Sequence, residues 1–159
     1  METNMGMEIE RKFLVHDAPF ETWGRGVKIE QGYLARGQEA TARVRTFGTK
    51  GFLTIKGKTI GISRQEFEYE IPLKEAQALL KLCEGGIIIK RRWHVKFESH
   101  TWEIDRFEGN NAGLIIAEIE LETENELFIK PNWLGAEVSD DPRYFNGALS
   151  RHPYQTWSI

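Results

Sequence analysis

Alternation of charged and apolar residues at every second position runs through most of this chain and constrains its fold more than any other feature. Successive side chains of a β-strand point to opposite faces, so residues two apart share a face. The alternation predicts eight strands, at Glu8–Val15, Lys28–Arg36, Thr41–Phe47, Phe52–Lys58, Ile62–Ile71, Ile87–Glu98, Thr101–Glu108 and Leu114–Glu122. Tight connections such as Gly48–Gly51 favour hairpins and therefore antiparallel pairing.

Two segments interrupt the alternation and predict helices. In Leu73–Glu84, which follows Pro72, apolar residues recur at helical spacing, and the pair Gly85 and Gly86 predicts the end of the helix. Asp140–Leu149 offers an aspartate as N-cap and a proline in the first turn. The predicted fold class is therefore mainly β, with a few flanking helices.

Length, charge and cysteine content limit the remaining possibilities. The 159 residues suit one core, and we expect a disordered lead-in at residues 1–6 followed by a single domain at residues 7–159. The formal net charge of -3 gives no support for a nucleic-acid binder, and no apolar run predicts a membrane span or signal peptide. Cys83 is the only cysteine, which fits a reducing interior and predicts a cytoplasmic location.

Like charges stand side by side on the polar faces of the predicted strands. They are Glu8 with Glu10, Arg43 with Arg45, Lys56 with Lys58, Glu66 with Glu68, Lys90 with Arg92, Glu103 with Asp105, and Glu118 with Glu120. Two unit charges about 5 Å apart repel by roughly 3 kcal/mol at an effective dielectric near 20. A solvated outer face is the commoner origin of alternation, yet such faces usually mix the two signs. A solvated face and a charged cavity therefore both stay open at this point.

Closure of these strands into a barrel would let the charged faces line a water-filled interior. Carboxylate oxygens suit hard cations such as Mg²⁺ and Mn²⁺, whereas arginine and lysine suit phosphate oxygens. Both kinds of side chain in one cavity would indicate a metal-bound polyphosphate as the ligand.

The opening Glu8-Ile9-Glu10-Arg11-Lys12 resembles the E-x-E-x-K signature of the CYTH family, also called triphosphate tunnel metalloenzymes. Further motifs follow in the order of that family: Arg43-Val44-Arg45, Leu53–Lys58, Arg64–Glu68, Lys90–Trp93, Trp102–Phe107 and Ala117–Glu122. The closing Asp141–Asn146 is similar to the end of the short bacterial members. The resemblance implies an eight-stranded antiparallel closed tunnel that hydrolyses a small-molecule triphosphate, with inorganic triphosphate favoured in short bacterial members.

The resemblance also implies roles for individual residues. Those implied to hold two Mg²⁺ or Mn²⁺ ions are Glu8, Glu10, Asp105, Glu118 and Glu120. Those implied to bind the phosphates are Lys12, Arg43, Arg45, Lys56, Lys58, Arg64, Lys90 and Arg92. Glu8, Glu10, Lys12 and Lys90 are the expected catalytic residues. For each basic residue, a surface or salt-bridging role is the alternative.

Several alternatives remain beside the triphosphatase. They are an adenylate cyclase, a thiamine or nucleoside triphosphatase, and a non-catalytic module that binds polyphosphate or nucleotides. Tyr33 is more readily explained by packing, and the four histidines lack the spacing of a metal site. We expect a monomer or homodimer with no nucleic-acid or membrane partner.

Overall fold

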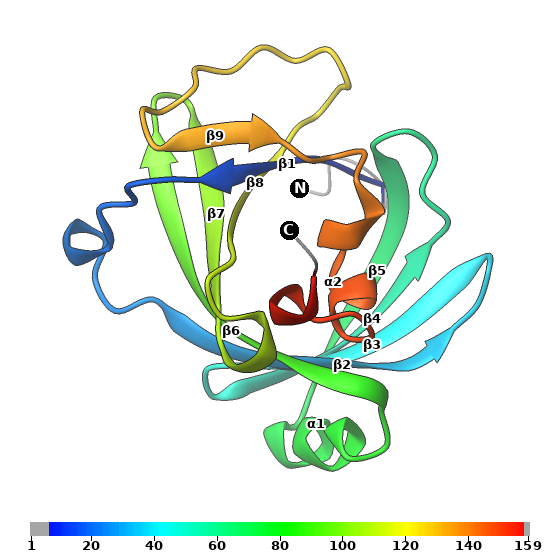
Figure 1. Ribbon diagram of the computed structural model, residues 1–159. Coiled ribbons are helices and arrows are strands. Elements are labelled where there is room, and N and C mark those ends of the chain that lie inside the picture. Colours follow the sequence, from blue (N-terminus) through cyan, green and yellow to red (C-terminus); the bar gives the residue numbers. More distant parts are fainter. Residues whose placement is uncertain (1–6, 158–159) are drawn as a thin grey trace.

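The computed structural model describes residues 7–157, with side chains described from Ile9 onward, so the predicted lead-in lies outside the described residues. Eight antiparallel strands close into a barrel around a common interior (Figure 1). They are β1 (Met7–Val15), β2 (Val27–Arg36), β3 (Ala40–Phe47), β4 (Lys50–Gly57), β5 (Ser63–Ile71), β6 (Glu84–Phe97), β7 (His100–Phe107) and β8 (Ile115–Glu120). The strand order is β5-β4-β3-β2-β6-β7-β8-β1, and pairing of β1 with β5 closes the ring.

The predicted mainly-β fold and its eight barrel strands are confirmed, with small shifts in their bounds. β6 begins at Glu84, which pairs with Tyr33 of β2, so helix α1 (Leu73–Leu80) ends four residues before its predicted last residue. A ninth strand, β9 (Leu134–Glu137), pairs with β1 and was not predicted. Its sequence Leu-Gly-Ala-Glu carries no period-two alternation.

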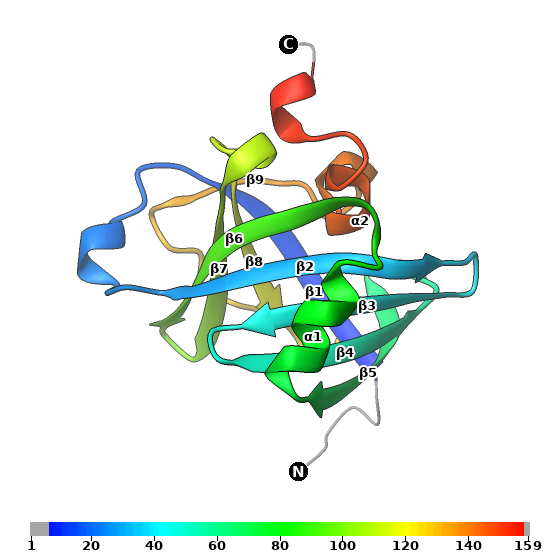
Figure 2. The same ribbon diagram turned by 90° about the horizontal axis from the view of Figure 1, so that it is seen from below.

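Helix α1 covers the outer face of the barrel over β3 and β4 (Figure 2). Ala76 at its centre is fully buried. A Cβ placed on Gly51 of β4 would lie 2.6 Å from the Ala76 Cβ, so this close approach requires glycine. No helix in residues 7–157 is long and apolar enough to cross a membrane.

The predicted C-terminal helix is two shorter elements. The 3-10 helix η3 (Pro142–Tyr144) starts at Asp141, whose side chain accepts a hydrogen bond from the Arg143 amide, and α2 (Asn146–Leu149) follows. Phe145 separates them because its backbone is extended, with φ -71° and ψ 141°. Three further 3-10 helices are η1 (Phe20–Thr22), η2 (Gly109–Asn111) and η4 (Tyr154–Thr156). Figure 2 shows α2 at one end of the barrel.

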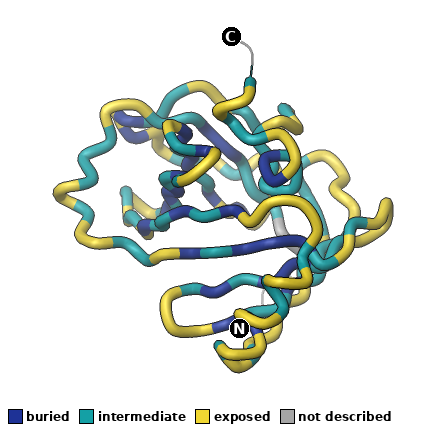
Figure 3. Tube along the Cα trace, turned by 60° about the horizontal axis from the view of Figure 1, so that its bottom comes forward, coloured by how far each residue is buried: buried dark blue, intermediate teal, exposed yellow. Residues whose placement is uncertain are grey.

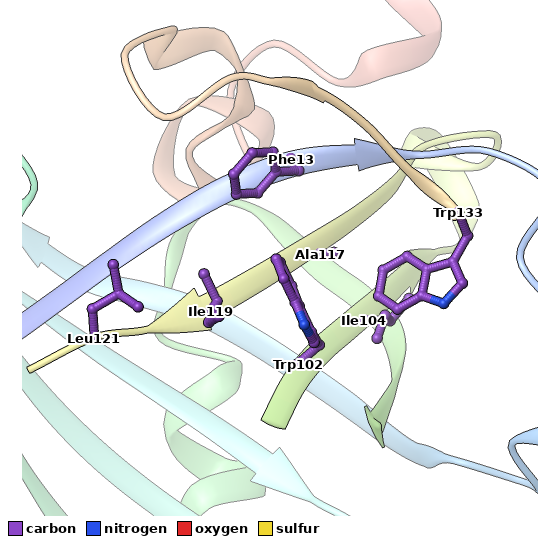
Figure 4. Packing of buried hydrophobic residues seen from close by; sticks show 7 residues of the cluster. All are labelled: Phe13, Trp102, Ile104, Ala117, Ile119, Leu121 and Trp133. Atoms are coloured by element: carbon purple, nitrogen blue, oxygen red, sulfur yellow. The ribbon is translucent and has the colours of Figure 1, made fainter. Parts of the chain in front are cut away.

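Two apolar clusters stabilise the barrel, one outside it and one at the end that α2 covers. The outer cluster consists of Phe13, Trp102, Ile104, Ala117, Ile119, Leu121 and Trp133 (Figure 4). The second consists of Ile88, Phe107, Leu114, Ile116 and Leu149. Figure 3 shows that buried residues are spread over several strands, whereas many loops are exposed. Ile88 and Ile116 share a face with Lys90 and Glu118, so the interior is charged over part of its length and apolar at this end.

Candidate functional site

A cavity of about 580 Å³ occupies the charged part of the barrel interior. Its walls carry charged side chains from β1, β3, β4, β5, β6, β7 and β8. The charged lining residues are Glu10, Lys12, Arg43, Arg45, Lys56, Arg64, Glu66, Glu68, Arg92, Glu103, Glu118 and Glu120. The charged faces of these strands therefore meet around one cavity, as the sequence pattern predicted for strands that close into a barrel.

Six of the eight residues predicted to bind phosphate line this cavity: Lys12, Arg43, Arg45, Lys56, Arg64 and Arg92. Arg43 is 8% exposed and forms no ion pair with any described residue; its Nε has no hydrogen-bond partner. Burial and the neighbouring Arg43 lower the pKa of Arg45, whose guanidinium lies 3.3 Å from Glu68. These two guanidiniums form the part of the wall best suited to an anionic ligand.

Lys58 and Lys90, the other two predicted phosphate ligands, are not among the residues that line the cavity. β4 ends at Gly57, and the chain turns tightly between Ile60 and Ser63, which leaves Lys58 exposed beyond the strand. Lys90 points inward but is fully buried behind the cavity wall. The predicted strand at Phe52–Lys58 is therefore wrong at its end, because the strand stops at Gly57 before this turn.

Lys90 belongs to a buried ionic network centred on Asp105. Lys90 Nζ lies 2.7 Å from Asp105 Oδ2, and Arg92 Nε and Nη2 donate to the two carboxylate oxygens at 2.7 and 2.8 Å. Burial lowers the pKa of Lys90 to about 8. Burial alone would raise the pKa of Asp105, but Arg92 and Lys90 hold it far below its ordinary value. Asp105, which was predicted to bind metal, is therefore ion-paired with the Lys90 and Arg92 side chains and does not line the cavity.

The predicted carboxylate ligands of β1 and β8 face one another across the strand pair. Glu10 is in register with Glu120, and Lys12 is in register with Glu118. Lys12 Nζ lies 2.9 Å from Glu118 Oε2. Burial would raise the pKa of Glu118, but the Lys12 ammonium holds it well below its usual range. Glu8 is in register with Arg64 on β5, and its side chain lies outside the described part of the chain.

The side chains that line the cavity include ligand atoms of the type that divalent metal ions prefer. Glu10, Glu118 and Glu120 supply only carboxylate oxygens, which hard cations prefer. No group of three or more Asp, Glu, His or Cys side chains within the described residues is arranged to hold a metal by itself. Mg²⁺ usually binds through one or two protein carboxylates plus substrate phosphates, and Glu10 and Glu120, which are in register on neighbouring strands, could supply such carboxylates.

Several lining residues received no role from the sequence. Glu66 and Glu68 alternate with apolar residues in the same way as the predicted residues do. Thr54 donates a hydrogen bond to Glu68 at 2.9 Å. His94 lines the cavity 3.3 Å from Glu103. These three follow from alternation alone, because they share a face with predicted residues.

Tyr33 and the C-terminal segment also line the cavity. The Arg36 guanidinium lies 4.4 Å from the Tyr33 ring centroid, and it donates to the carbonyl oxygen of Gly147 at 2.6 Å. Asn146 lines the cavity, and its Oδ1 accepts a long hydrogen bond of 3.5 Å from Lys90. No sequence pattern indicates that residues so far along the chain reach this wall.

Comparison with known proteins agrees with this architecture. Residues 6–145 match the CYTH domain family. The chain is 49% identical over 154 residues to the inorganic triphosphatase of Acetivibrio thermocellus, covering 96% of this chain and 99% of that protein. It is 37% identical over 147 residues to the inorganic triphosphatase of Nitrosomonas europaea, covering 90% and 96%.

Solved structures give the same result. The crystal structure of the inorganic triphosphatase NE1496 superposes with a TM-score of 0.65 at 36% identity, covering 90% of this chain and 93% of that one. The match extends over nearly the whole of both chains. The family match and the two relatives agree with the closed eight-stranded barrel and its ionic interior. The chain belongs to the CYTH domain family.

Proposed function

We propose that this chain hydrolyses inorganic triphosphate to diphosphate and phosphate inside its barrel, with the help of a divalent metal ion. The observation that carries the proposal is the meeting of several guanidinium groups, of which Arg43 has no ion pair among the described residues, with several carboxylates in one cavity of about 580 Å³. Two relatives, at 49% and 37% identity, bear the name inorganic triphosphatase. A triphosphate bound to a cation presents the complementary charges.

The basic wall would bind the phosphate oxygens and stabilise the charge that develops on the leaving diphosphate. Arg43 and Arg45 offer adjacent guanidiniums from β3, and Lys56 of β4 lines the same cavity. Lys12, Arg64 and Arg92 extend this surface. Because Arg43 is buried without a carboxylate partner among the described residues, an anionic ligand would satisfy it.

Membership of the CYTH family implies dependence on a divalent metal ion. Glu10 and Glu120, with Glu118 and Glu8 beside them in sequence, would hold two ions, Mg²⁺ or Mn²⁺. When bound, such ions neutralise phosphoryl oxygens and lower the pKa of a coordinated water. Lys12 contacts Oε2 of Glu118, so the other carboxylate oxygen of Glu118 could bind a metal ion while this contact persists.

Lys90 and Asp105 would act behind the cavity wall. The Asp105 carboxylate fixes the Arg92 guanidinium through two hydrogen bonds, and Lys90 compensates the remaining charge. This arrangement would keep Arg92, which lines the cavity, charged and oriented toward bound phosphate.

A panel of triphosphates with Mg²⁺ and with Mn²⁺ tests this function directly. Inorganic triphosphate, ATP and thiamine triphosphate are compared by initial rate, and products are separated by ion exchange. We expect a kcat/KM for inorganic triphosphate at least tenfold above the others, with phosphate and diphosphate as products and no activity in chelator. Cyclic AMP from ATP would identify a cyclase, and binding without turnover would identify a non-catalytic module; either result overturns the proposal.

A cytoplasmic location and a monomeric or homodimeric state stay predictions.

A further inference from the structure

Three cations form a row across the outer face of the barrel, on the side away from the cavity. Lys28 of β2 is in register with Arg91 of β6, which is in register with Arg106 of β7. Arg25, from the loop before β2, joins them around a shallow depression of about 610 Å³. Like charges directly opposite one another on neighbouring strands destabilise a sheet.

These guanidiniums lack the acidic neighbours that other outer arginines have. Arg11, Arg143 and Arg151 each lie within 4 Å of a carboxylate. Among the described residues, no carboxylate lies that close to the three arginines of the depression.

Two acidic side chains stand near the row. Lys28 lies 3.9 Å from Glu30, and Glu21 lines the depression with the four cations. Four positive charges therefore face one lining carboxylate, which leaves a local excess of positive charge.

The guanidinium groups are held in place before any ligand arrives. Arg106 lies 4.9 Å from the centroid of the Phe20 ring and 4.9 Å from that of Trp93. Arg91 Nη1 donates to the Arg25 carbonyl at 3.2 Å, and Trp93 Nε1 donates to the Gly24 carbonyl at 2.9 Å. Such anchoring reduces the entropy lost when a ligand binds.

The loop at residues 24–26 lines the same depression. Gly24 and Gly26 have positive φ angles of 84° and 70°. A Cβ on Gly26 would lie 2.7 Å from the Trp93 ring, so the loop approaches β6 closely only because this residue is glycine. The amides of residues 24, 25 and 26 donate to no acceptor in the described part of the chain. Successive unsatisfied amides in a turn form anion-binding concavities.

We infer that this depression is a second anion site, separate from the barrel cavity, which binds a multiply charged phosphate oxyanion such as diphosphate. A compact oxyanion suits the site better than a nucleotide base, because Arg106 already covers the aromatic rings of Phe20 and Trp93. Its charge is complementary to the four cations, and its oxygens match the guanidinium and amide donors. The inference does not depend on what the barrel cavity hydrolyses.

Diphosphate titration followed by ¹H–¹⁵N NMR tests the site on the full chain. The Gly24 and Gly26 amides and the Trp93 indole N–H are local reporters. We expect saturable shifts of these signals, and a dissociation constant raised about tenfold for each guanidinium removed in Arg25→Gln and in Arg25→Gln/Arg91→Gln. Arg25 is exposed, so the single variant tests the site even if the double variant folds poorly.

Two controls separate this site from the cavity. Arg151→Gln removes an outer arginine that pairs with Glu84, and it should leave the titration unchanged. Arg43→Ala alters the cavity and should also preserve the shifts at Gly24, Gly26 and Trp93. Absence of saturable shifts in the unmodified protein, equal affinity in the arginine variants, or loss of the shifts in Arg43→Ala would each overturn the inference. Triphosphate hydrolysis by the same variants reports on the cavity separately.

Discussion

A buried guanidinium without a carboxylate partner destabilises a folded protein unless a ligand neutralises it. Arg43 is such a residue, because it is 8% exposed, lines the cavity and forms no ion pair within the described residues. Lys90 and Asp105 are equally buried, but they compensate each other. At the residue scale, this difference leads us to propose that Arg43 binds substrate, whereas Lys90 and Asp105 support the cavity wall.

We expect Arg43→Ala to lower kcat/KM for inorganic triphosphate by about a hundredfold or more, because a charge that stabilises the transition state is lost. The melting temperature without ligand should stay the same or rise, since an unpaired buried charge disappears. Arg151→Ala, which removes an outer arginine paired with Glu84, is the matched control. Near-normal turnover by the Arg43 variant would show that the cavity assignment is wrong.

Asp105→Asn separates a structural role of this carboxylate from metal binding. The change leaves Lys90 and Arg92 buried without their shared counter-charge, so unfolding in urea with chelator present should become easier by about 3–5 kcal/mol. Unchanged stability in chelator together with weaker metal binding would instead support the metal-ligand role implied by the family resemblance.

The sequence could predict which side chains face the interior, but not how deep each one lies. Alternation places Lys90 and Arg92 on the same face, yet only Arg92 lines the cavity. Depth depends on the apolar cluster around Ile88 and Leu149 that fills one end of the barrel. Asn146 was missed because long-range packing alone brings it to the wall, whereas Tyr33 is in register with Arg43 and could have been inferred from that strand pairing.

Among the elements, α2 is too short to be stable by itself and must be held by contacts with the barrel. Leu149 is fully buried in the apolar cluster at the barrel end, and Arg36 donates to the Gly147 carbonyl. Asn146 and Gly147 line the cavity. The position of α2 therefore shapes the site as well as closing the apolar end.

Leu149→Ala should lower the free energy of unfolding by about 2–5 kcal/mol, because it leaves a void in this cluster. KM for triphosphate should rise as well, since residues of α2 line the cavity. Chemical denaturation and steady-state kinetics measure the two effects. Leu127→Ala is the control, because Leu127 is 90% exposed and should change neither quantity. A stability loss with unchanged KM would show that α2 does not shape the site.

The link between β9 and β1 predicts a defined pH dependence. Arg11 donates two hydrogen bonds to Glu137, at 2.9 and 2.6 Å, and this contact lowers the pKa of Glu137 from its ordinary value of 4.5. A carboxylate whose pKa is lowered by folding stabilises the folded state above its unfolded pKa and loses that effect as the pH falls through its folded pKa. Stability from this pair is thus complete at neutral pH and disappears in acid.

We expect Glu137→Gln to destabilise the protein at pH 7 by only about 0.5–1 kcal/mol, because the pair is partly exposed and screened by solvent. The difference from the unmodified protein should shrink as the pH falls below the ordinary value of 4.5. Urea denaturation across this range gives the measurement. A difference that stays constant down to acid pH would mean that the ion pair does not contribute.

Two differences between the predicted and observed elements have physical causes. β9 carries no alternation and exists because β1 offers it an edge beyond the end of its pairing with β5. The C-terminal helix is interrupted because Phe145 is extended between η3 and α2. The eight barrel strands were predictable because each has one charged and one apolar face.

At the scale of the whole molecule, seven of the eight barrel strands turn charged side chains toward the cavity, whereas β2 contributes Tyr33 there and places Lys28 on the outer face. The outer cluster around Trp102 is covered by the segment that leads into β9 (Figure 4). Among the described residues, the cavity wall holds six basic and six acidic side chains, some of them paired, as Lys12 is with Glu118, and a triphosphate with its metal ion would add charges complementary to both kinds. Ligand at a hundred times its dissociation constant would stabilise the fold by about 2.7 kcal/mol.

The location of bound metal and triphosphate tests the central claim most directly. In crystals grown with Mn²⁺ and a non-hydrolysable imidotriphosphate, anomalous diffraction locates the manganese and electron density locates the triphosphate analogue. We predict manganese beside Glu10 and Glu120 and phosphate oxygens beside Arg43, Arg45 and Lys56, all inside the barrel. Manganese and triphosphate found only on the outer surface, with the cavity holding neither, would contradict the account.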